Sequence, residues 1–258
     1  MKEMEFGAQL YSLRDLLTTK EDVEKTFTKV AEMGYKSVQV SGMKYLDIQQ
    51  IKELSEKLDL KVVGAHVSID RFEQEFETVM EEYSALGAPT CGVGGAGGDK
   101  FEQTADGVKK LTEHLVGISE KMKPYNIKFT YHNHAFEFIK YDGKTQFDIM
   151  IEESRGADNF TFCYDTYWAQ VGGVDVCEYI EKLTGRLPLL HLKDHKMVDR
   201  NNFTMCEIGQ GTLNWKNIIE TYQKTNPGGF MVVEQDYCDG CPLDSMKISI
   251  DYLMKNFG

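Results

Sequence analysis

The chain has 258 residues, enough for one large core or two small domains, and its content of 41% hydrophobic and 27% charged residues is ordinary for a soluble globular protein. Its formal net charge of -12 disfavours nucleic-acid binding, because acidic surfaces repel phosphate backbones. The sequence has no apolar run long enough to span a bilayer and no apolar signal core at its start, so we expect a cytoplasmic protein that binds neither nucleic acid nor membrane.

Short apolar runs alternate with segments of helical periodicity along the whole chain. The first helix is well delimited, because Thr18 and Thr19 offer N-caps and Gly34 offers a C-terminal stop. Strands are predicted at residues 6–10, 37–40, 61–67, 90–93, 160–164, 187–192 and 230–233, and a further strand opens at residue 128. Helices are predicted at about 18–34, 48–58, 72–87, 104–122, 147–153, 176–183, 213–222 and 245–257.

This alternation has no Pro-rich or Gly-rich linker to divide it. Strand–helix alternation needs crossover connections and therefore a parallel sheet. Units of about thirty residues predict an α/β fold in which residues 1–258 form a single (β/α)8 TIM barrel domain. The alternative is an open doubly wound sheet, which would usually carry a glycine-rich phosphate turn after its first strand. Residues 12–15 have no glycine there.

The stretch KFTYHNHAFEF at 128–138 is the centre of the chemical pattern. Side chains two apart on a strand share a face, so His132 and His134 should point the same way, with Glu137 just beyond the strand end. Buried polar groups cost free energy unless they are paired, so a core strand does not need this chemistry. We interpret the stretch as part of a functional site; the alternative is a surface strand end with solvated histidines.

Polar side chains recur where other predicted strands end. In a (β/α)8 barrel the active site lies at the C-terminal ends of the strands, so these side chains should converge on one rim. They are Gln9, Tyr11, His66, Asp165, His191, Lys193, Asp194, Glu234 and Asp236.

Imidazoles and carboxylates from neighbouring strands form a donor set that divalent metals prefer. The strands are the fifth to eighth, which adjoin one another around the ring. We therefore expect one divalent metal ion, with manganese, zinc, cobalt and magnesium as the candidates. The predicted ligands are His132, Asp165, His191 and Glu234.

Motifs spread over essentially the whole chain carry a resemblance to a known superfamily. They are GAQLYSLRD at 7–15, GAHVS at 64–68, YHNHAFEF at 131–138, Asp165 with Trp168, LLHLKD at 189–194, IGQGTLNW at 208–215 and VVEQD at 232–236. Together they resemble the xylose isomerase-like sugar isomerases and epimerases, a superfamily that includes inosose dehydratases, hydroxypyruvate isomerases, ketose 3-epimerases and type IV apurinic endonucleases.

The resemblance implies that Asp165, His191 and Glu234 are metal ligands and that His132 stands where the fifth strand usually supplies a glutamate. It also places Glu137 near a substrate-contacting carboxylate of the epimerases. Because His132 takes the place of the fifth-strand glutamate, the two-glutamate acid/base pair of that family is not intact here. The side chains expected to bind substrate are His66, Lys193, Gln9 and Trp168, the last by stacking on a sugar ring or by packing alone.

The resemblance implies an isomerase or epimerase of a small keto sugar or sugar phosphate. The metal would chelate a carbonyl and its neighbouring hydroxyl and stabilise an enediolate. The candidate bases are Glu234, Glu137 and His134. Alternatives are a metal-dependent lyase or dehydratase acting on a keto-inositol or keto sugar, a metal-free sugar-binding barrel, and a type IV-like endonuclease, which the net charge of -12 disfavours. The partner is then a small carbohydrate, and a homo-oligomer is compatible with the sequence.

Three other features are interpreted structurally. Residues 92–98, GVGGAGG, lack the lysine of a phosphate-binding loop and predict a wide, flexible fourth loop beside the site. Trp215 is expected in the core. The six cysteines do not form a disulfide framework, and the CxxC pair Cys238 and Cys241 lacks the partners of a zinc or thioredoxin-like motif, so free thiols are expected.

Overall fold

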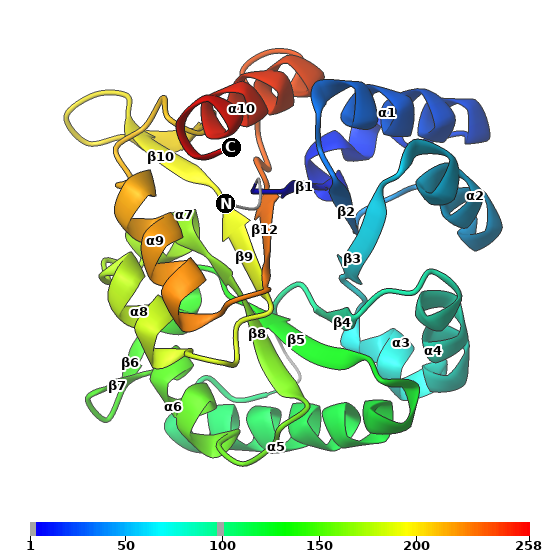
Figure 1. Cartoon of the computed structure of the whole chain (residues 1–258). Helices are drawn as coiled ribbons and strands as arrows, with labels where there is room; N and C mark the ends of the chain where they lie inside the picture. Colours follow the sequence, from blue (N-terminus) through cyan, green and yellow to red (C-terminus); the bar gives the residue numbers. More distant parts are fainter. Residues whose placement is uncertain (1–3, 97–100) are drawn as a thin grey trace.

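Parallel strands form a ring at the centre of the molecule, and helices surround it (Figure 1). The structure is a computed structural model and describes residues 4–96 and 101–258. The strands of the ring are β1 (Phe6–Gln9), β2 (Ser37–Val40), β3 (Lys61–Ala65), β4 (Thr90–Val93), β5 (Lys128–His132), β8 (Phe160–Asp165), β9 (Leu189–Leu192) and β12 (Phe230–Val233).

These eight strands follow the order β3-β2-β1-β12-β9-β8-β5-β4 in one sheet, and every neighbouring pair is parallel. The two ends of this order meet through a parallel bridge between His66 and Gly92. The Val67 N–H also donates to the Gly92 carbonyl at 2.8 Å. The sheet therefore closes into a barrel. The prediction of a (β/α)8 barrel is confirmed, and the open doubly wound sheet is excluded.

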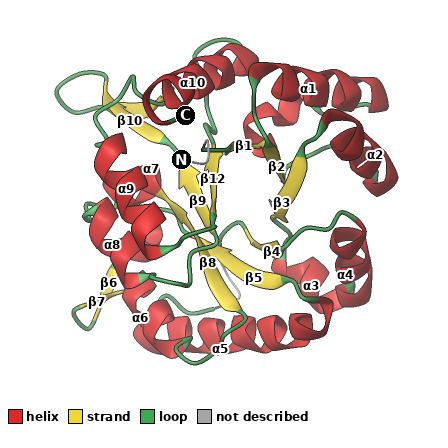
Figure 2. Cartoon of the chain, viewed as in Figure 1, coloured by secondary structure: helices red, strands yellow, loops and turns green. Residues whose placement is uncertain are grey.

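Helices cover the outside of the ring (Figure 2). The first helix has the predicted ends, because the Thr19 side chain accepts a hydrogen bond from the Asp22 N–H and Gly34 ends it with a φ of 105°. The helices are α1 (Lys20–Met33), α2 (Ile48–Leu58), α3 (Ile69–Gln74), α4 (Phe76–Ala85), α5 (Ala105–Met122), α6 (Gln146–Glu153), α7 (Thr166–Val171), α8 (Val176–Lys182), α9 (Trp215–Thr225) and α10 (Pro242–Phe257).

Several elements differ from the sequence prediction. The helix predicted at 72–87 is two helices, α3 and α4, which meet at Glu75 with a φ of -132°. Helix α7 was not predicted, because six residues are too few to display a helical period. The sequence also did not reveal two hairpins and three 3-10 helices. The hairpins are β10 (Asp194–Met197) with β11 (Phe203–Cys206) and β6 (Lys140–Tyr141) with β7 (Lys144–Thr145), and the 3-10 helices are η1 (Leu10–Leu16), η2 (Lys123–Tyr125) and η3 (Phe136–Phe138).

A layer of apolar side chains fills the barrel interior below its C-terminal rim. Strand alternation puts Cys163, Leu189 and Val232 on the same faces as Asp165, His191 and Glu234, which lie two residues further along. Those three apolar residues and Val63 form a separate, fully buried cluster. A packed layer of apolar side chains therefore lies directly beneath the C-terminal strand ends and holds them in place.

Two further structural predictions are confirmed. Trp215 is 2% exposed and belongs to the main core. All six cysteines are free thiols. Across the described residues, every helix is too short or too polar to cross a bilayer.

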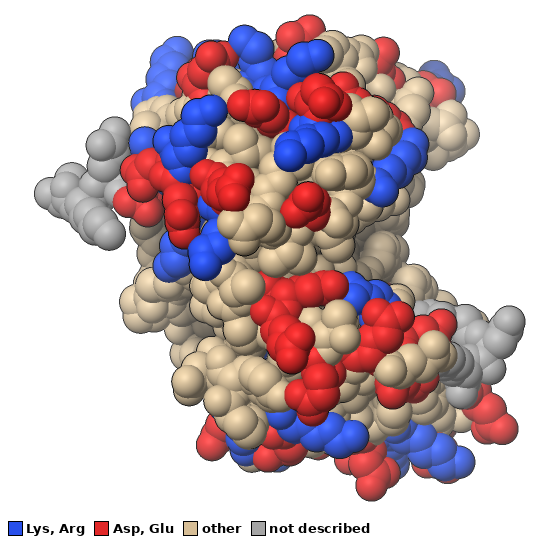
Figure 3. All heavy atoms as spheres, turned by 90° about the vertical axis from the view of Figure 1, so that its right-hand side faces the viewer, with Lys and Arg blue, Asp and Glu red and all other residues tan. Residues whose placement is uncertain are grey.

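Charge is unevenly distributed over the face drawn in Figure 3. Acidic side chains gather on its lower half, on the side where α3 and α4 lie in Figure 1. Helix α4 carries the exposed residues Glu77 and Glu81, and exposed Glu75 lies between α3 and α4. On the upper half, Lys and Arg are interspersed with Asp and Glu.

Candidate metal centre and active site

Four predicted ligands meet at the C-terminal rim of the barrel. His132 and Asp165 are the last residues of β5 and β8, His191 is in β9, and Glu234 follows β12. Since these strands are neighbours in the sheet, their ends bring the side chains together. One ligand atom from each of the four residues lies within 4.8 Å of all the others, and all four side chains are buried.

The donor atoms of these side chains face one another. His191 Nδ1 lies 2.8 Å from Glu234 Oε2, and His132 Nε2 lies 3.5 Å from Asp165 Oδ2. His132 Nε2, Asp165 Oδ2, His191 Nδ1 and Glu234 Oε2 all lack a well-aligned hydrogen-bond partner among the described residues. Buried polar atoms are normally paired, so this convergence indicates a missing partner. Two imidazole nitrogens and two carboxylate oxygens suit a divalent cation, and the residues therefore fit a metal.

The two carboxylate oxygens of Asp165 have different surroundings. Its Oδ1 accepts a hydrogen bond from the Trp168 N–H at 2.9 Å and caps α7. Its backbone N–H donates to Asn133 Oδ1 at 2.9 Å, which fixes the strand end. The Oδ2 atom is left facing the other ligands, as a metal-binding oxygen requires.

Lys193 is a fixed positive charge at the same place. Its ammonium nitrogen lies 3.0 Å from Asp165 Oδ2, 2.9 Å from Glu234 Oε2 and 2.9 Å from Asp236 Oδ2, and the residue is 1% exposed. Three carboxylates and one ammonium leave two negative charges uncompensated when the histidines are neutral. That residual charge matches a divalent cation.

Burial and neighbouring charges shift the pKa values of the ligands. Burial alone would raise the pKa of Glu234, but Lys193 and His191 hold it well below its usual range. Burial alone would lower the pKa of His191, but Cys163 and Glu234 raise it well above its usual value. Because burial also raises the pKa of the Cys163 thiol, the Glu234 carboxylate is the neighbour that is charged at neutral pH. Burial lowers the pKa of His132, which favours the neutral, ligating imidazole.

A cavity of about 400 Å³ opens above the ligands. Besides the predicted metal ligands, four of the residues predicted to bind or transform substrate line it: His66, His134, Trp168 and Lys193. The ring centroids of His134 and Trp168 lie 5.4 Å apart. Trp168 Nε1 and His134 Nδ1 are buried and have no hydrogen-bond partner within residues 4–96 and 101–258. The other lining residues are Tyr11, Ser41, Gly94, His132, Glu234 and Asp236.

Two of the residues predicted to bind or transform substrate do not line this cavity. Glu137 is fully buried; its Oε1 accepts a hydrogen bond from the Tyr131 hydroxyl at 2.8 Å, and its Oε2 accepts one from the His134 N–H at 2.7 Å. Burial raises its pKa to about 7. Gln9 is also fully buried, and its Oε1 accepts a hydrogen bond from the Tyr11 N–H at 3.3 Å. Glu137 therefore holds the loop that carries His134.

Asp194 anchors the loop after β9 and does not face the cavity. Its carboxylate accepts hydrogen bonds from the Trp215 indole N–H at 2.8 Å and from the Gly209 N–H at 2.9 Å. The glycine-rich stretch predicted to form a flexible fourth loop is described only as far as Ala96, and residues 97 and 98 lie outside the described residues.

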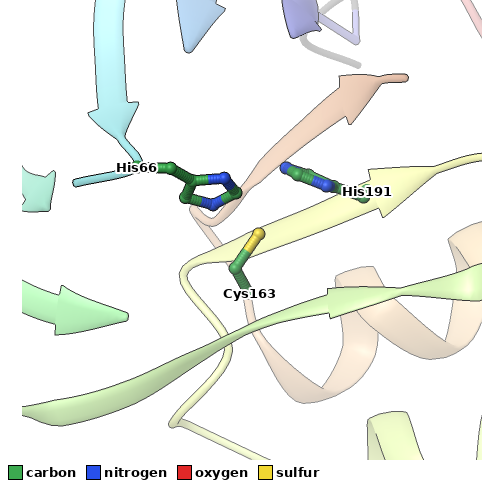
Figure 4. A group of neighbouring side chains, drawn as sticks. All are labelled: His66, Cys163 and His191. Atoms are coloured by element: carbon green, nitrogen blue, oxygen red, sulfur yellow. The ribbon is translucent and has the colours of Figure 1, made fainter. Parts of the chain in front are cut away.

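Two features of the candidate site were not predicted from the sequence. Gln39 of β2 contacts both His191 and His66 through its amide. A second group of candidate donors, His66, Cys163 and His191, points inward from the end of β3 and from β8 and β9 (Figure 4). A polar residue inside the apolar run SVQV was the available signal for Gln39.

Comparison with known proteins agrees with the fold. A family model described as a xylose isomerase-like TIM barrel matches residues 27–255. No curated protein matches the chain. Two solved structures titled as sugar phosphate isomerase/epimerases from Parabacteroides distasonis ATCC 8503 superpose with TM-scores of 0.81 and 0.80 at 19% and 24% identity. The matches cover 99% of this chain and 95% of the first structure, and 97% of this chain and 98% of the second.

A third solved structure carries a metal. It is titled as the IOLI protein with a binding zinc atom, and it superposes with a TM-score of 0.76 at 13% identity. The match covers 99% of this chain and 99% of that one. At these identities, the three superpositions establish the fold.

Proposed function

Because this chain belongs to the family of xylose isomerase-like TIM barrels, which is a family of enzymes, we propose that it is a divalent-metal-dependent isomerase or epimerase of a small keto sugar. The observation that carries the proposal is the convergence of His132, Asp165, His191 and Glu234, whose buried donor atoms lack a well-aligned hydrogen-bond partner among the described residues. The zinc in the similar IOLI structure is consistent with such a centre.

The charge of the cavity favours an unphosphorylated sugar. Lys193 is the one lysine or arginine among the described residues that line the cavity, and Asp165, Glu234 and Asp236 already compensate it. A phosphate group would meet these carboxylates, and the described lining offers it no uncompensated lysine or arginine. A neutral sugar, in contrast, can use the Trp168 indole N–H and the His134 imidazole as hydrogen-bond partners.

A bound divalent cation would polarise a substrate carbonyl and increase the acidity of the neighbouring C–H. His132, Asp165, His191 and Glu234 would hold this cation. His66 and Trp168, which both line the cavity, would orient the sugar, and Lys193 would contact a hydroxyl near Asp236. A side chain that lines the cavity must accept the proton.

Asp236 is the base that geometry and charge favour. It lines the cavity, and burial together with nearby Glu234 raises its pKa to about 6, close to the pH at which a base works best. His134 is the second candidate; burial and His132 lower its pKa to about 4, so it is a neutral but weak base. Glu234 is a third, weaker candidate because its pKa is held well below its usual range.

The test combines metal analysis with proton exchange. The purified protein would be loaded with Mn²⁺, and its metal content measured by elemental analysis. It would then be incubated with a panel of unphosphorylated keto sugars and keto-inositols in D₂O. We expect one metal per chain and deuterium at the α-carbon of the turnover substrate, with both lost after chelation. Elimination of a β-leaving group in place of proton return would assign the enzyme as a lyase. Turnover that survives complete chelation would exclude the proposal.

A further inference from the structure

Gln39 lies between two imidazoles that belong to the site. It is fully buried in β2, its Oε1 lies 2.5 Å from His191 Nε2, and its Nε2 lies 3.0 Å from His66 Nε2. The centroids of the two rings are 5.6 Å apart. One amide therefore connects a predicted metal ligand to a residue of the cavity wall.

The chemistry of the amide fixes which ring nitrogen carries the proton. An amide oxygen only accepts and an amide nitrogen only donates, so His191 Nε2 must carry a hydrogen and His66 Nε2 must accept one. In metal-bound His191 the lone pair is then on Nδ1. That atom lies 2.8 Å from Glu234 Oε2 and 3.9 Å from Asp165 Oδ2, on the side where the other ligands converge.

We infer that Gln39 is a positioning residue that reserves His191 Nδ1 for the metal and holds His66 in the opposite tautomer, with its proton on Nδ1. The inference rests on the proposed metal centre. Histidines that bind metals usually donate their other ring N–H to a fixed acceptor, and Gln39 is that acceptor here.

The same contact explains which of two donor groups takes the metal. His191 belongs both to the group with His132, Asp165 and Glu234 and to the group with His66 and Cys163 (Figure 4). Gln39 engages one nitrogen of His66 and one of His191, and it leaves the free nitrogen of His191 beside the carboxylates. The metal is thereby directed to the carboxylate-containing group.

The backbone of β2 is shaped for this contact. The pairing between β2 and β3 shifts register between Val38 and Gln39, and Gly64 lies opposite Gln39. Register irregularities of this kind often redirect a side chain next to an active site. An apolar residue would pack in the barrel interior without needing partners, whereas both polar atoms of the Gln39 amide are used.

The first test is metal affinity. Gln39→Leu should weaken Zn²⁺ and Mn²⁺ binding by about ten- to a hundredfold, the usual effect of removing the partner of a ligating histidine. Gln50→Leu is the matched control, because Gln50 is a buried glutamine of α2 whose amide donates to the Lys20 carbonyl, away from the site. Gln39→Glu keeps an acceptor for His191 Nε2–H, so its metal affinity should not fall. Equal affinity in Gln39→Leu and the unsubstituted protein would overturn the inference.

The second test reads the tautomer directly in the unsubstituted protein and does not depend on any variant folding. In ¹⁵N-histidine-labelled protein, NMR should show a hydrogen on His191 Nε2 with and without Zn²⁺, and Zn²⁺ should shift the Nδ1 resonance. A bare Nε2 would mean that the amide is reversed and would overturn the inference. If the protein binds no metal, the proposed function fails, while the proton on Nε2 still tests the contact with Gln39.

Discussion

Lys193 Nζ lies 2.9 Å from Glu234 Oε2, so a buried ammonium contacts a carboxylate that is also a predicted metal ligand. The same ammonium contacts Asp165 and Asp236. These carboxylates would repel one another in the metal-free protein without it. Lys193 and a bound divalent metal would therefore neutralise the same charges.

Replacing this lysine should make stability depend on metal. We expect Lys193→Met to destabilise the metal-free protein by about 3–5 kcal/mol, because the variant leaves buried carboxylates without their partner. Bound Mn²⁺ should restore most of that loss. Urea unfolding with and without Mn²⁺ measures the difference. An equal loss in both conditions would show that Lys193 and the metal do not act on the same charges.

Metal affinity should rise with pH through neutrality. The pKa of His191 is raised well above its usual value, so the metal-free site holds a proton that the metal must displace. Below that pKa, affinity should fall by about tenfold per pH unit, since one proton is exchanged for one metal. The pKa of His132 is lowered, so protonation of this imidazole should weaken metal binding only at acidic pH. Calorimetric titration at several pH values, in buffers of different ionisation enthalpy, counts the protons released; a flat profile would remove His191 from the ligand set.

Two substitutions of Asp165 should separate its roles. Asp165→Asn keeps an oxygen that can cap α7 but removes the ligating charge, so metal binding should be lost with little change in stability. Asp165→Ala also loses the cap, which should cost about 1 kcal/mol more. Elemental analysis and urea unfolding of both variants distinguish the effects. Full metal occupancy in Asp165→Asn would exclude Asp165 as an essential ligand.

Glu137 should make the protein less stable as pH rises. Burial raises its pKa from 4.5 to about 7, so the folded state binds a proton that the unfolded state releases between these values. Stability should therefore fall by about 3 kcal/mol as pH rises from about 4.5 through 7, and Glu137→Gln should abolish this slope. The comparison needs urea unfolding of both proteins at about pH 5 and pH 8. Identical pH slopes would show that Glu137 is already ionised in the folded state.

The strand ends could be predicted from the sequence because a single rule determines them. Side chains alternate along a strand, so an apolar run such as FTFCYD fixes which residues face the barrel interior and where the run ends. Asp165, His191 and Glu234 all follow that rule, and their convergence then results from the closure of the barrel. The family resemblance, now confirmed, added their expected roles.

Side-chain alternation predicts the direction of a side chain only within a strand, and not in the turn that follows it. Glu137 was expected beside the substrate, but it lies in the 3-10 turn Phe136–Phe138, which turns its carboxylate back toward Tyr131. Gln39 was missed for a different reason: its partners, His66 and His191, are 27 and 152 residues away in the chain. Local pattern does not encode such a contact, which exists only once the barrel has closed.

The last prediction concerns the base that removes the substrate proton. Asp236 lines the cavity and has a pKa raised to about 6, whereas Glu137 lies outside the cavity and Glu234 has a pKa held well below its usual range. Asp236→Asn should therefore lower the rate of α-deuterium exchange by about a hundredfold or more, in line with the contribution of a general base.

Metal content must be measured beside the exchange rate, because a base that is not a ligand can be replaced without losing metal. We expect Asp236→Asn to retain Mn²⁺, and Glu234→Gln to lose both metal and exchange. Glu137→Gln should retain metal and reduce exchange only modestly, through a less fixed His134 loop. If His134→Gln instead abolishes exchange with metal bound while Asp236→Asn remains active, the proton is taken by the imidazole, and Asp236 serves only to hold Lys193 in place.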